Sequence, residues 1–211
     1  MVRYNTTLYW QKMSIEAVIW DLGGVILRTE DIAPRAALAG RLGLTREELV
    51  AQIWEGEDFR RATLGEIPEG TYWKAITSHY GLKYKEFMKD FFGGDRVDEQ
   101  LLKVIRALRP RYKTALLTNS FSDLRYWIEN VGKFNDAFDA MIISAEIRLM
   151  KPDTAIYEYA LRQINVKAET AVFIDDRAVN VDGARRAGLQ GIQFQTREQA
   201  LAELHGLLDA H

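Results

Sequence analysis

AVIWDLGGVIL, residues 17–27, joins a short apolar run to an acid and a pair of glycines. The first four residues contain no polar break, which is typical of a strand buried on both faces of a parallel sheet. Asp21 ends the run, and Gly23 and Gly24 then allow the backbone to turn sharply and to approach a ligand. Because open α/β sheets bind ligands at the carboxyl ends of their strands, Asp21 is a candidate functional residue. An aspartate at a strand end also forms ordinary turns, so this stretch alone leaves both interpretations open.

The composition is that of a folded globular protein and argues against several classes of function. The 211 residues are 47% hydrophobic and 27% charged, so the chain can bury a full core. The 28 lysines and arginines do not exceed the 30 acidic residues, so the chain lacks the basic excess of a nucleic-acid-binding surface. The absence of cysteine excludes disulfides and thiolate nucleophiles, and none of the three histidines lies beside a glycine-rich turn or an acidic cluster.

No apolar run is long enough to span a bilayer, and residues 1–13 lack the apolar segment of a signal peptide. We therefore expect a cytoplasmic protein without nucleic-acid or membrane partners, either a monomer or a homodimer. Residues 1–14 are expected to be an N-terminal extension, to which we assign no role.

The pattern changes from strand-like to helical after Leu27 and stays helical for about 70 residues. Four helices are predicted there, at residues 34–42, 45–55, 57–64 and 67–80, with a capping box of Thr45 and Glu48 at the start of the second. Their tryptophan and tyrosine side chains are expected to pack in a core. We interpret residues 28–96 as an inserted helical cap domain.

Strands and helices alternate through the rest of the chain. After a helix from Val97, strands are predicted at residues 113–118, 140–144, 170–174 and 190–194, and helices at residues 123–130, 154–163, 179–187 and 197–208. Such alternation specifies an α/β fold, in which a parallel sheet carries helices on both faces. Residues 15–27 and 97–211 would together form this core domain.

Polar side chains follow several of these strands. They are Thr118 at the end of one strand with Asn119 and Ser120 after it, Lys151 in the loop before a helix, and Asp175 and Asp176 after a further strand. Because parallel strands end at one edge of the sheet, these groups should converge with Asp21. Adjacent carboxylates repel each other and a divalent cation relieves the repulsion, while Lys151 and the small polar groups suit an anionic oxygen. The set favours Mg²⁺-dependent phosphoryl transfer, with Asp21 attacking the phosphorus.

At this point the sequence resembles the haloacid dehalogenase-like hydrolase superfamily. Four motifs stand in family order, namely WDLGGV, LLTNS, LMKPD and FIDDRAVNVDGA, and the match runs from about residue 15 to the end of the chain. The resemblance implies a Rossmann-like core, a helical cap inserted after the first strand, Mg²⁺ and an aspartyl-phosphate intermediate. The branch whose first motif reads DLG-G/N-V, which includes sugar-phosphate phosphatases, is the most similar.

The resemblance also implies a role for each matching residue. Asp21 would be the nucleophile and a metal ligand, the Gly23 carbonyl a second ligand, and Asp176 a third, with Asp175 in the same shell or acting through water. Thr118 and Asn119 would bind the phosphate, and Lys151 would pair with both the phosphate and Asp21. Ser120, the next residue, remains a candidate for binding the substrate. Asn180 resembles a residue that ties the acidic loop together. Thr154 stands where proline is common, which we judge harmless.

Gly23 is the departure that matters, because most phosphatases of the family carry a second aspartate there as proton donor and base. Its absence predicts a preference for acidic leaving groups, as in sugar-1-phosphates and aryl phosphates, over simple alkyl esters. The alternative is that a cap carboxylate, Glu57 or Asp58, replaces it. The charged segment 55–66 is expected to face the crevice, with Phe59, Arg60 and Arg61 as candidate substrate selectors. The other interpretation of these charges is a solvated outer face.

The sequence thus favours a Mg²⁺-dependent phosphatase of small phosphorylated metabolites. One alternative is a 2-haloacid dehalogenase, which keeps the aspartate nucleophile but needs no metal, so that the paired acids at 175 and 176 argue against it. The other is a binding or regulatory domain with weak or no turnover.

Overall fold

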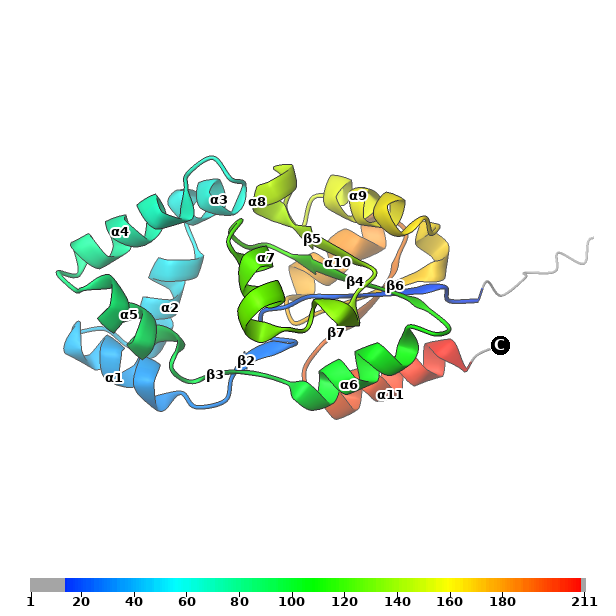
Figure 1. The fold of residues 1–211 in the computed structure, drawn as a ribbon, viewed down its shortest axis with the longest axis horizontal. Coiled ribbons are helices and arrows are strands. Elements are labelled where there is room, and N and C mark those ends of the chain that lie inside the picture. Colours follow the sequence, from blue (N-terminus) through cyan, green and yellow to red (C-terminus); the bar gives the residue numbers. More distant parts are fainter. Residues whose placement is uncertain (1–13, 210–211) are drawn as a thin grey trace, which may run out of the picture.

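The computed structural model describes residues 14–209 and is built around a sheet of five parallel strands (Figure 1). Across the sheet the order is β5 (Ala140–Ile143), β4 (Lys113–Thr118), β1 (Ala17–Trp20), β6 (Ala171–Asp175) and β7 (Gln190–Gln193). All four residues of the central strand β1 are completely buried. The predicted N-terminal extension lies outside the described residues except for Ser14.

Helices cover both faces of the sheet because successive side chains of a strand point to opposite sides. Val18 and Trp20 of β1 pack in one core with α6 and α11, and Ala17 and Ile19 pack in another with α9 and α10. In Figure 1, α6 and α11 lie on one side of the sheet and α9 on the other. The helices are α6 (Glu99–Leu108), α9 (Thr154–Ile164), α10 (Ala178–Arg186) and α11 (Arg197–Leu208). The predicted α/β fold with a Rossmann-like parallel sheet is confirmed.

Shorter elements lie in the connections of the core. They are α7 (Leu124–Trp127), a π-helical turn (Ile128–Gly132), two 3₁₀ turns (Asn135–Ala137 and Ala168–Thr170) and α8 (Ser144–Ile147). The single helix predicted at residues 123–130 is therefore divided, because the chain widens into the π turn after Trp127. The strand predicted to include Ser144 ends one residue earlier, and Ser144 begins α8.

A bundle of five helices, which we call the cap, stands between β1 and α6 in the sequence. These helices are α1 (Ala33–Arg41), α2 (Arg46–Trp54), α3 (Glu57–Thr63), α4 (Glu69–His79) and α5 (Tyr84–Phe92). The first four match the predicted helices to within a few residues. The predicted capping box is present: the Glu48 amide donates to Thr45 Oγ1 at 3.2 Å, and the Thr45 amide donates to Glu48 Oε2 at 2.8 Å.

The sequence analysis missed α5, which buries Phe87 and Phe91 between polar neighbours. These two rings join the buried Tyr72 and Trp73 in a separate apolar core of the cap. The predicted packing role of the cap aromatics agrees with this arrangement.

Two short strands, β2 (Leu27–Thr29) and β3 (Asp95–Val97), form an antiparallel ribbon where the chain enters and leaves the cap. The predicted domain limits at residues 28 and 96 fall within this ribbon. The helix predicted from Val97 is present as α6, but it begins two residues later, at Glu99 after the N-cap Asp98, because Val97 pairs with Leu27 in the ribbon. Within the part of the chain that the structure describes, no helix is both long enough and apolar enough to cross a membrane.

Candidate active site

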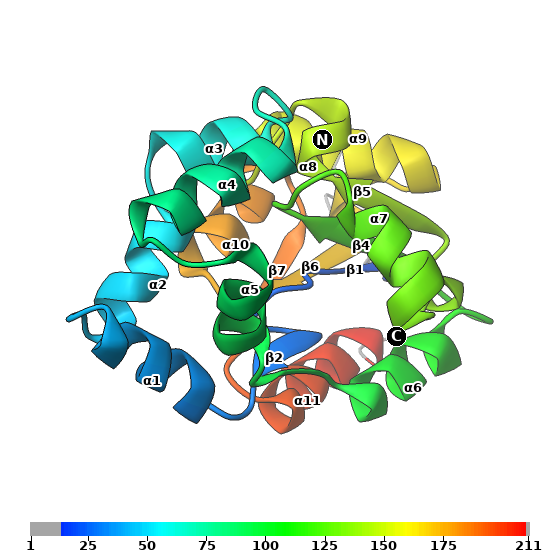
Figure 2. The ribbon, with the colours of Figure 1, turned by 60° about the vertical axis from the view of Figure 1, so that its left-hand side comes forward.

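The strand register brings the predicted site residues to one edge of the sheet. Trp20 of β1 lies opposite Leu116 of β4 and Ile174 of β6, so Asp21, Thr118 and Asp175 follow at neighbouring strand ends. In Figure 1, β1 runs toward the cap, and Figure 2 turns the cap side toward the reader. The convergence expected from parallel strands is therefore found, and it takes place between the core and the cap.

Lys151 lies between two of the acids and is only 2% exposed. Its Nζ is 2.8 Å from Asp21 Oδ1 and 2.6 Å from Asp175 Oδ2. The ammonium also lies over the Phe173 ring, 5.2 Å from its centroid. A buried ammonium is stable only when it is paired in this way, so Lys151 and the two carboxylates form one electrostatic unit.

The acids outnumber the ammonium that neutralises them. Oxygens of Asp21, Asp175 and Asp176 all lie within 4.8 Å of one another. Burial, with the charges of Asp175 and Asp176, raises the pKa of Asp21 to about 7 even though Lys151 opposes the shift. Burial and the charge of Asp175 likewise raise the pKa of Asp176. Burial and mutual repulsion therefore disfavour the ionised carboxylates, and a divalent cation would relieve both effects.

Asp175 has both carboxylate oxygens occupied by donors of the protein. Asn180 Nδ2 donates to both oxygens at 3.0 Å, and the Arg177 amide donates to Oδ1 at 2.8 Å. With Lys151 on Oδ2, this carboxylate is a fixed anchor for the lysine. Asp21 and Asp176 are therefore better suited than Asp175 to contact a metal ion directly.

The structure requires glycine at position 24 but not at position 23. Gly24 has φ +76°, and a Cβ atom there would lie 2.3 Å from Asp176 Oδ2, so the turn needs glycine to approach the acid. A Cβ atom on Gly23 would meet nothing within 4 Å. Position 23 thus has room for a side chain that this protein lacks. Hard oxygen donors from Asp21, Asp176 and the Gly23 carbonyl suit Mg²⁺.

The three polar residues at the end of β4, predicted to bind phosphate, have different partners in the protein. Thr118 is 4% exposed and ends the strand at the site. Asn119 uses its carboxamide on the backbone of Lys151: Nδ2 donates to the Lys151 carbonyl at 2.9 Å, and the Lys151 amide donates to Oδ1 at 2.8 Å. The Ser120 amide donates to Ser144 Oγ at 3.0 Å. The Asn119 carboxamide is therefore engaged by the backbone of Lys151, and one hydrogen of Nδ2 remains for a ligand.

Ser144 is the residue here whose contacts the sequence analysis missed. Its hydroxyl is buried, donates to the carbonyl of Thr63 in the cap at 2.6 Å and accepts from Ser120 in the core. The signal available in the sequence was a small hydroxyl residue directly after an apolar strand.

The candidate selectors in the cap lie in two environments. Arg60 and Arg61 are exposed and pair with Glu57 and Glu66, at 2.6 and 3.3 Å. Phe59 instead packs in the cap, with its ring centroid 5.4 Å from Trp54 and 6.1 Å from Phe121.

Glu57 is a poor candidate for the missing proton donor. Two hydrogen bonds from Arg60 lower its pKa, so this carboxylate stays ionised at neutral pH and has no proton to give. The alternative that a cap carboxylate replaces the aspartate absent at position 23 rests on Asp58.

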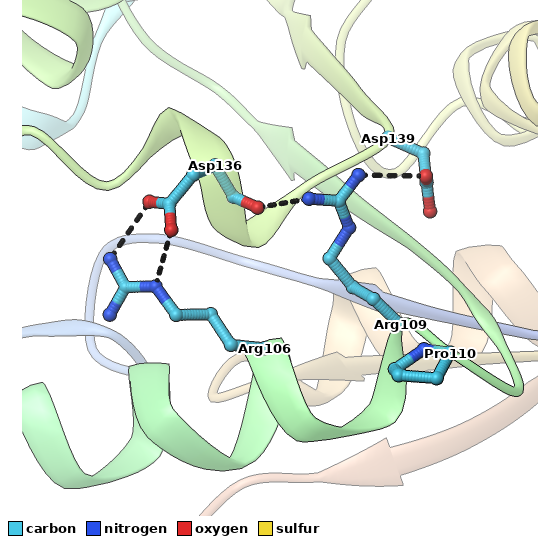
Figure 3. A pocket seen from close by; sticks show the side chains of 5 residues that line it. All are labelled: Arg106, Arg109, Pro110, Asp136 and Asp139. Carbon is cyan, nitrogen blue, oxygen red and sulfur yellow. Dashed lines mark hydrogen bonds and ion pairs between the residues drawn. The ribbon is translucent and has the colours of Figure 1, made fainter.

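A shallow hollow of about 440 Å³ lies at the opposite, amino-terminal edge of the sheet (Figure 3). Figure 3 shows its arginines turned toward acids of the same surface: Arg106 pairs with Asp136 at 2.7 Å, and Arg109 with Asp139 at 3.0 Å. Because these charges neutralise one another, the hollow offers no free cation to an anionic ligand, and we assign it no role.

Comparison with known proteins gives relatives over most of the chain. A sesquiterpene phosphatase from Aspergillus oryzae is 26% identical over 92% of this chain and 97% of its own length. A D-ribitol-5-phosphate phosphatase from Bacteroides thetaiotaomicron is 24% identical over 93% of this chain and its full length. A drimenol cyclase from Aspergillus calidoustus is 28% identical over 90% of this chain, which spans only 36% of that longer protein.

A solved structure supports the fold. A haloacid dehalogenase family enzyme from Bacteroides thetaiotaomicron, in complex with magnesium and inorganic phosphate, superposes with a TM-score of 0.71 at 20% identity, over 87% of this chain and 96% of its own. A profile of the haloacid dehalogenase-like hydrolases matches residues 15–188, a span that contains the acids, the lysine and the whole cap. The chain therefore belongs to the haloacid dehalogenase-like hydrolases and is an enzyme of that family.

Proposed function

We propose that this hydrolase is a Mg²⁺-dependent phosphatase of a small phosphorylated metabolite, with a sugar phosphate as the leading class. The observation that carries the proposal is the meeting of Asp21, Asp175, Asp176 and Lys151 at one edge of the sheet. Relatives of similar length that are named as phosphatases support it. A dehalogenase would have no use for three clustered carboxylates, so the alternative within the family is less well supported.

Mg²⁺ would be held by Asp21, Asp176 and the Gly23 carbonyl, and when bound it would neutralise charge on the phosphate oxygens. The Asp21 carboxylate attacks the phosphorus, a new O–P bond forms, and the bond to the leaving oxygen breaks with its electron pair going to that oxygen. Leu22 and Lys151 orient the nucleophile, because the Leu22 amide and the Lys151 ammonium both donate to Asp21 Oδ1, at 2.7 and 2.8 Å. The cationic Lys151 also favours the negative charge on the transferring group. Water then hydrolyses phospho-Asp21 and releases phosphate.

Lys151 is well suited to remain an ammonium through this cycle. Burial acts to lower its pKa, but the charges of Asp21 and Asp175 outweigh burial and raise it. The lysine therefore serves as a fixed positive charge, while any proton transfer must involve other groups.

The experiment is release of phosphate from an aryl phosphate, 4-nitrophenyl phosphate, with Mg²⁺ present and with excess chelator. We expect turnover that chelation abolishes and that Asp21→Asn removes, whereas Asp182→Asn, an exposed acid on α10, retains it. Equal turnover in chelator would contradict the metal assignment, and release of chloride from 2-chloropropionate would favour the dehalogenase. A folded protein with no turnover on a panel of phosphate esters would favour the binding domain.

A further inference from the structure

The three residues that follow Thr118 in the chain each contact a different part of the protein. Asn119 bonds to the loop that carries Lys151, Ser120 bonds to Ser144 under the cap, and Phe121 lies among cap aromatics. Residues 119–121 therefore join the lysine of the site to the cap.

Asn119 makes the first of these contacts with both ends of one carboxamide. It accepts from the Lys151 amide and donates to the Lys151 carbonyl, at 2.8 and 2.9 Å. The backbone of residue 151 is thus fixed against the end of β4. Since the ammonium must reach both Asp21 and Asp175, a shift of this backbone would lengthen those ion pairs.

Ser120 provides the second contact through the buried hydroxyl of Ser144. That hydroxyl accepts from the Ser120 amide at 3.0 Å and donates to the carbonyl of Thr63, at the end of cap helix α3, at 2.6 Å. The backbones of the cap and the core approach closely here: a Cβ atom on Gly65 would lie 2.4 Å from the carbonyl oxygen of Ala145. One hydroxyl therefore satisfies polar groups of the cap and of the core together.

Phe121 makes the third contact by entering the aromatic core of the cap. It is 7% exposed, and its ring centroid lies 5.4 Å from that of Tyr72 and 5.6 Å from that of Trp73. Such pairs stabilise a fold beyond the burial of apolar area. The phenyl ring therefore belongs to the cap although its backbone belongs to the core.

We propose that residues 119–121 couple docking of the cap to placement of Lys151, with Asn119 as a positioning residue rather than a phosphate ligand. The coupling follows from the length of the segment. Phe121 is two residues from Asn119, and two residues span at most about 7 Å, so the segment has little slack. If the cap leaves the core, Phe121 loses its partners in the cap and Ser144 loses Thr63, so the short segment that ends at the Asn119 carboxamide is held less firmly.

The structural test measures amide hydrogen exchange at Lys151 by NMR in the substrate-free protein, relative to the Ile19 amide in the central strand. Asn119→Ala removes the acceptor of this amide and should speed its exchange about tenfold, as expected for one lost hydrogen bond. Ser144→Ala leaves that acceptor in place but loosens the cap contact, and it should also speed Lys151 exchange selectively. The matched control is Ser122→Ala, which alters an exposed serine of the same loop and should leave the exchange of the Lys151 amide unchanged.

Normal Lys151 exchange in Ser144→Ala would overturn the coupling, and so would acceleration that Ile19 shares equally, since that reports general destabilisation. This arm needs no turnover, so it stands even if the proposed phosphatase function fails.

The kinetic arm rests on the proposed function and uses a double-mutant cycle with 4-nitrophenyl phosphate. Ser144→Ala should lower kcat about tenfold in the wild-type background, but less than about twofold when Asn119 is already alanine, because the link is then broken. Two losses that multiply in full would refute the coupling. Restoration of kcat by Ser144→Thr, which keeps the hydroxyl, would support it, and no restoration would count against it.

Discussion

Gly23 offers a direct test of how the reaction manages without a second aspartate. A Cβ atom at this position meets nothing within 4 Å, so Gly23→Asp should fold without a clash. Its neighbour is the opposite case, because a Cβ on Gly24 would enter the Asp176 carboxylate. The substitution would therefore add a carboxyl group two residues after the nucleophile without displacing a neighbouring side chain.

The expected size of the effect depends on the leaving group. General acid–base assistance is typically worth about 10²–10⁴ in rate. A phenol leaves with a pKa of about 10, whereas the pKa of a simple alcohol is far higher and close to that of water, so the alcohol needs the proton far more. We expect wild-type turnover to fall steeply from aryl to alkyl phosphates. Gly23→Asp should raise alkyl phosphate turnover by at least about tenfold. This value lies below the usual range because the surrounding residues are not arranged to position the new carboxyl group.

The assay is single-turnover and steady-state phosphate release over a series of aryl and alkyl phosphates at saturating Mg²⁺. Gly23→Ala is the matched control, since it fills the same space without a titratable group. A burst of alcohol or phenol release in the wild type would show that hydrolysis of phospho-Asp21 is also slow without a base. Equal gains in Gly23→Ala and Gly23→Asp, or a flat dependence on leaving-group acidity in the wild type, would refute the reasoning. A flat dependence that Asp58→Asn makes steep would show that the cap supplies the acid.

Three further predictions concern stability and metal binding. Lys151→Met leaves Asp21 and Asp175 buried without their cation and should cost about 3–5 kcal/mol in urea unfolding, whereas Met at the exposed Lys113 should cost little. Mg²⁺ should raise the melting temperature, because binding adds about 2.7 kcal/mol to the free energy of unfolding at a hundredfold excess over its Kd. Asp176→Asn should remove this stabilisation, whereas Asp182→Asn should retain it. Asp98 is buried, yet hydrogen bonds from Leu101, Arg28 and Arg197 outweigh burial and lower its pKa. The contribution of the Asp98 carboxylate to the free energy of unfolding should therefore be complete above about pH 4 and vanish as the pH falls through the lowered pKa. If the stability deficit of Asp98→Asn persists unchanged at lower pH, this prediction is wrong.

Those features that follow from local pattern were predictable from the sequence. The apolar run before Asp21 and the one before Asp175 each identify a buried strand, and parallel strands place both acids at one edge. By contrast, β2 and β3 have only three residues each, too few to show a period, so Val97 was assigned to the helix that follows it. The hydrogen bonds of Asn119 were also out of reach, because its partner is the backbone of a residue 32 positions away, and backbone contacts leave no mark on the side-chain pattern.

The burial of Lys151 explains why the site needs so many supports. An ammonium and two carboxylates removed from water gain stability only when every polar atom finds a partner. Asp175 meets that condition through Asn180 and the Arg177 amide, and the backbone of Lys151 meets it through Asn119. Burial and neighbouring acids raise the pKa values of Asp21 and Asp176, and Asp176 lies against Gly24, so the unbalanced negative charge gathers at the glycine turn that follows β1. The protein thus fixes its cation firmly and leaves the reactive acids under-neutralised, which is the arrangement that binding of a divalent cation would complete.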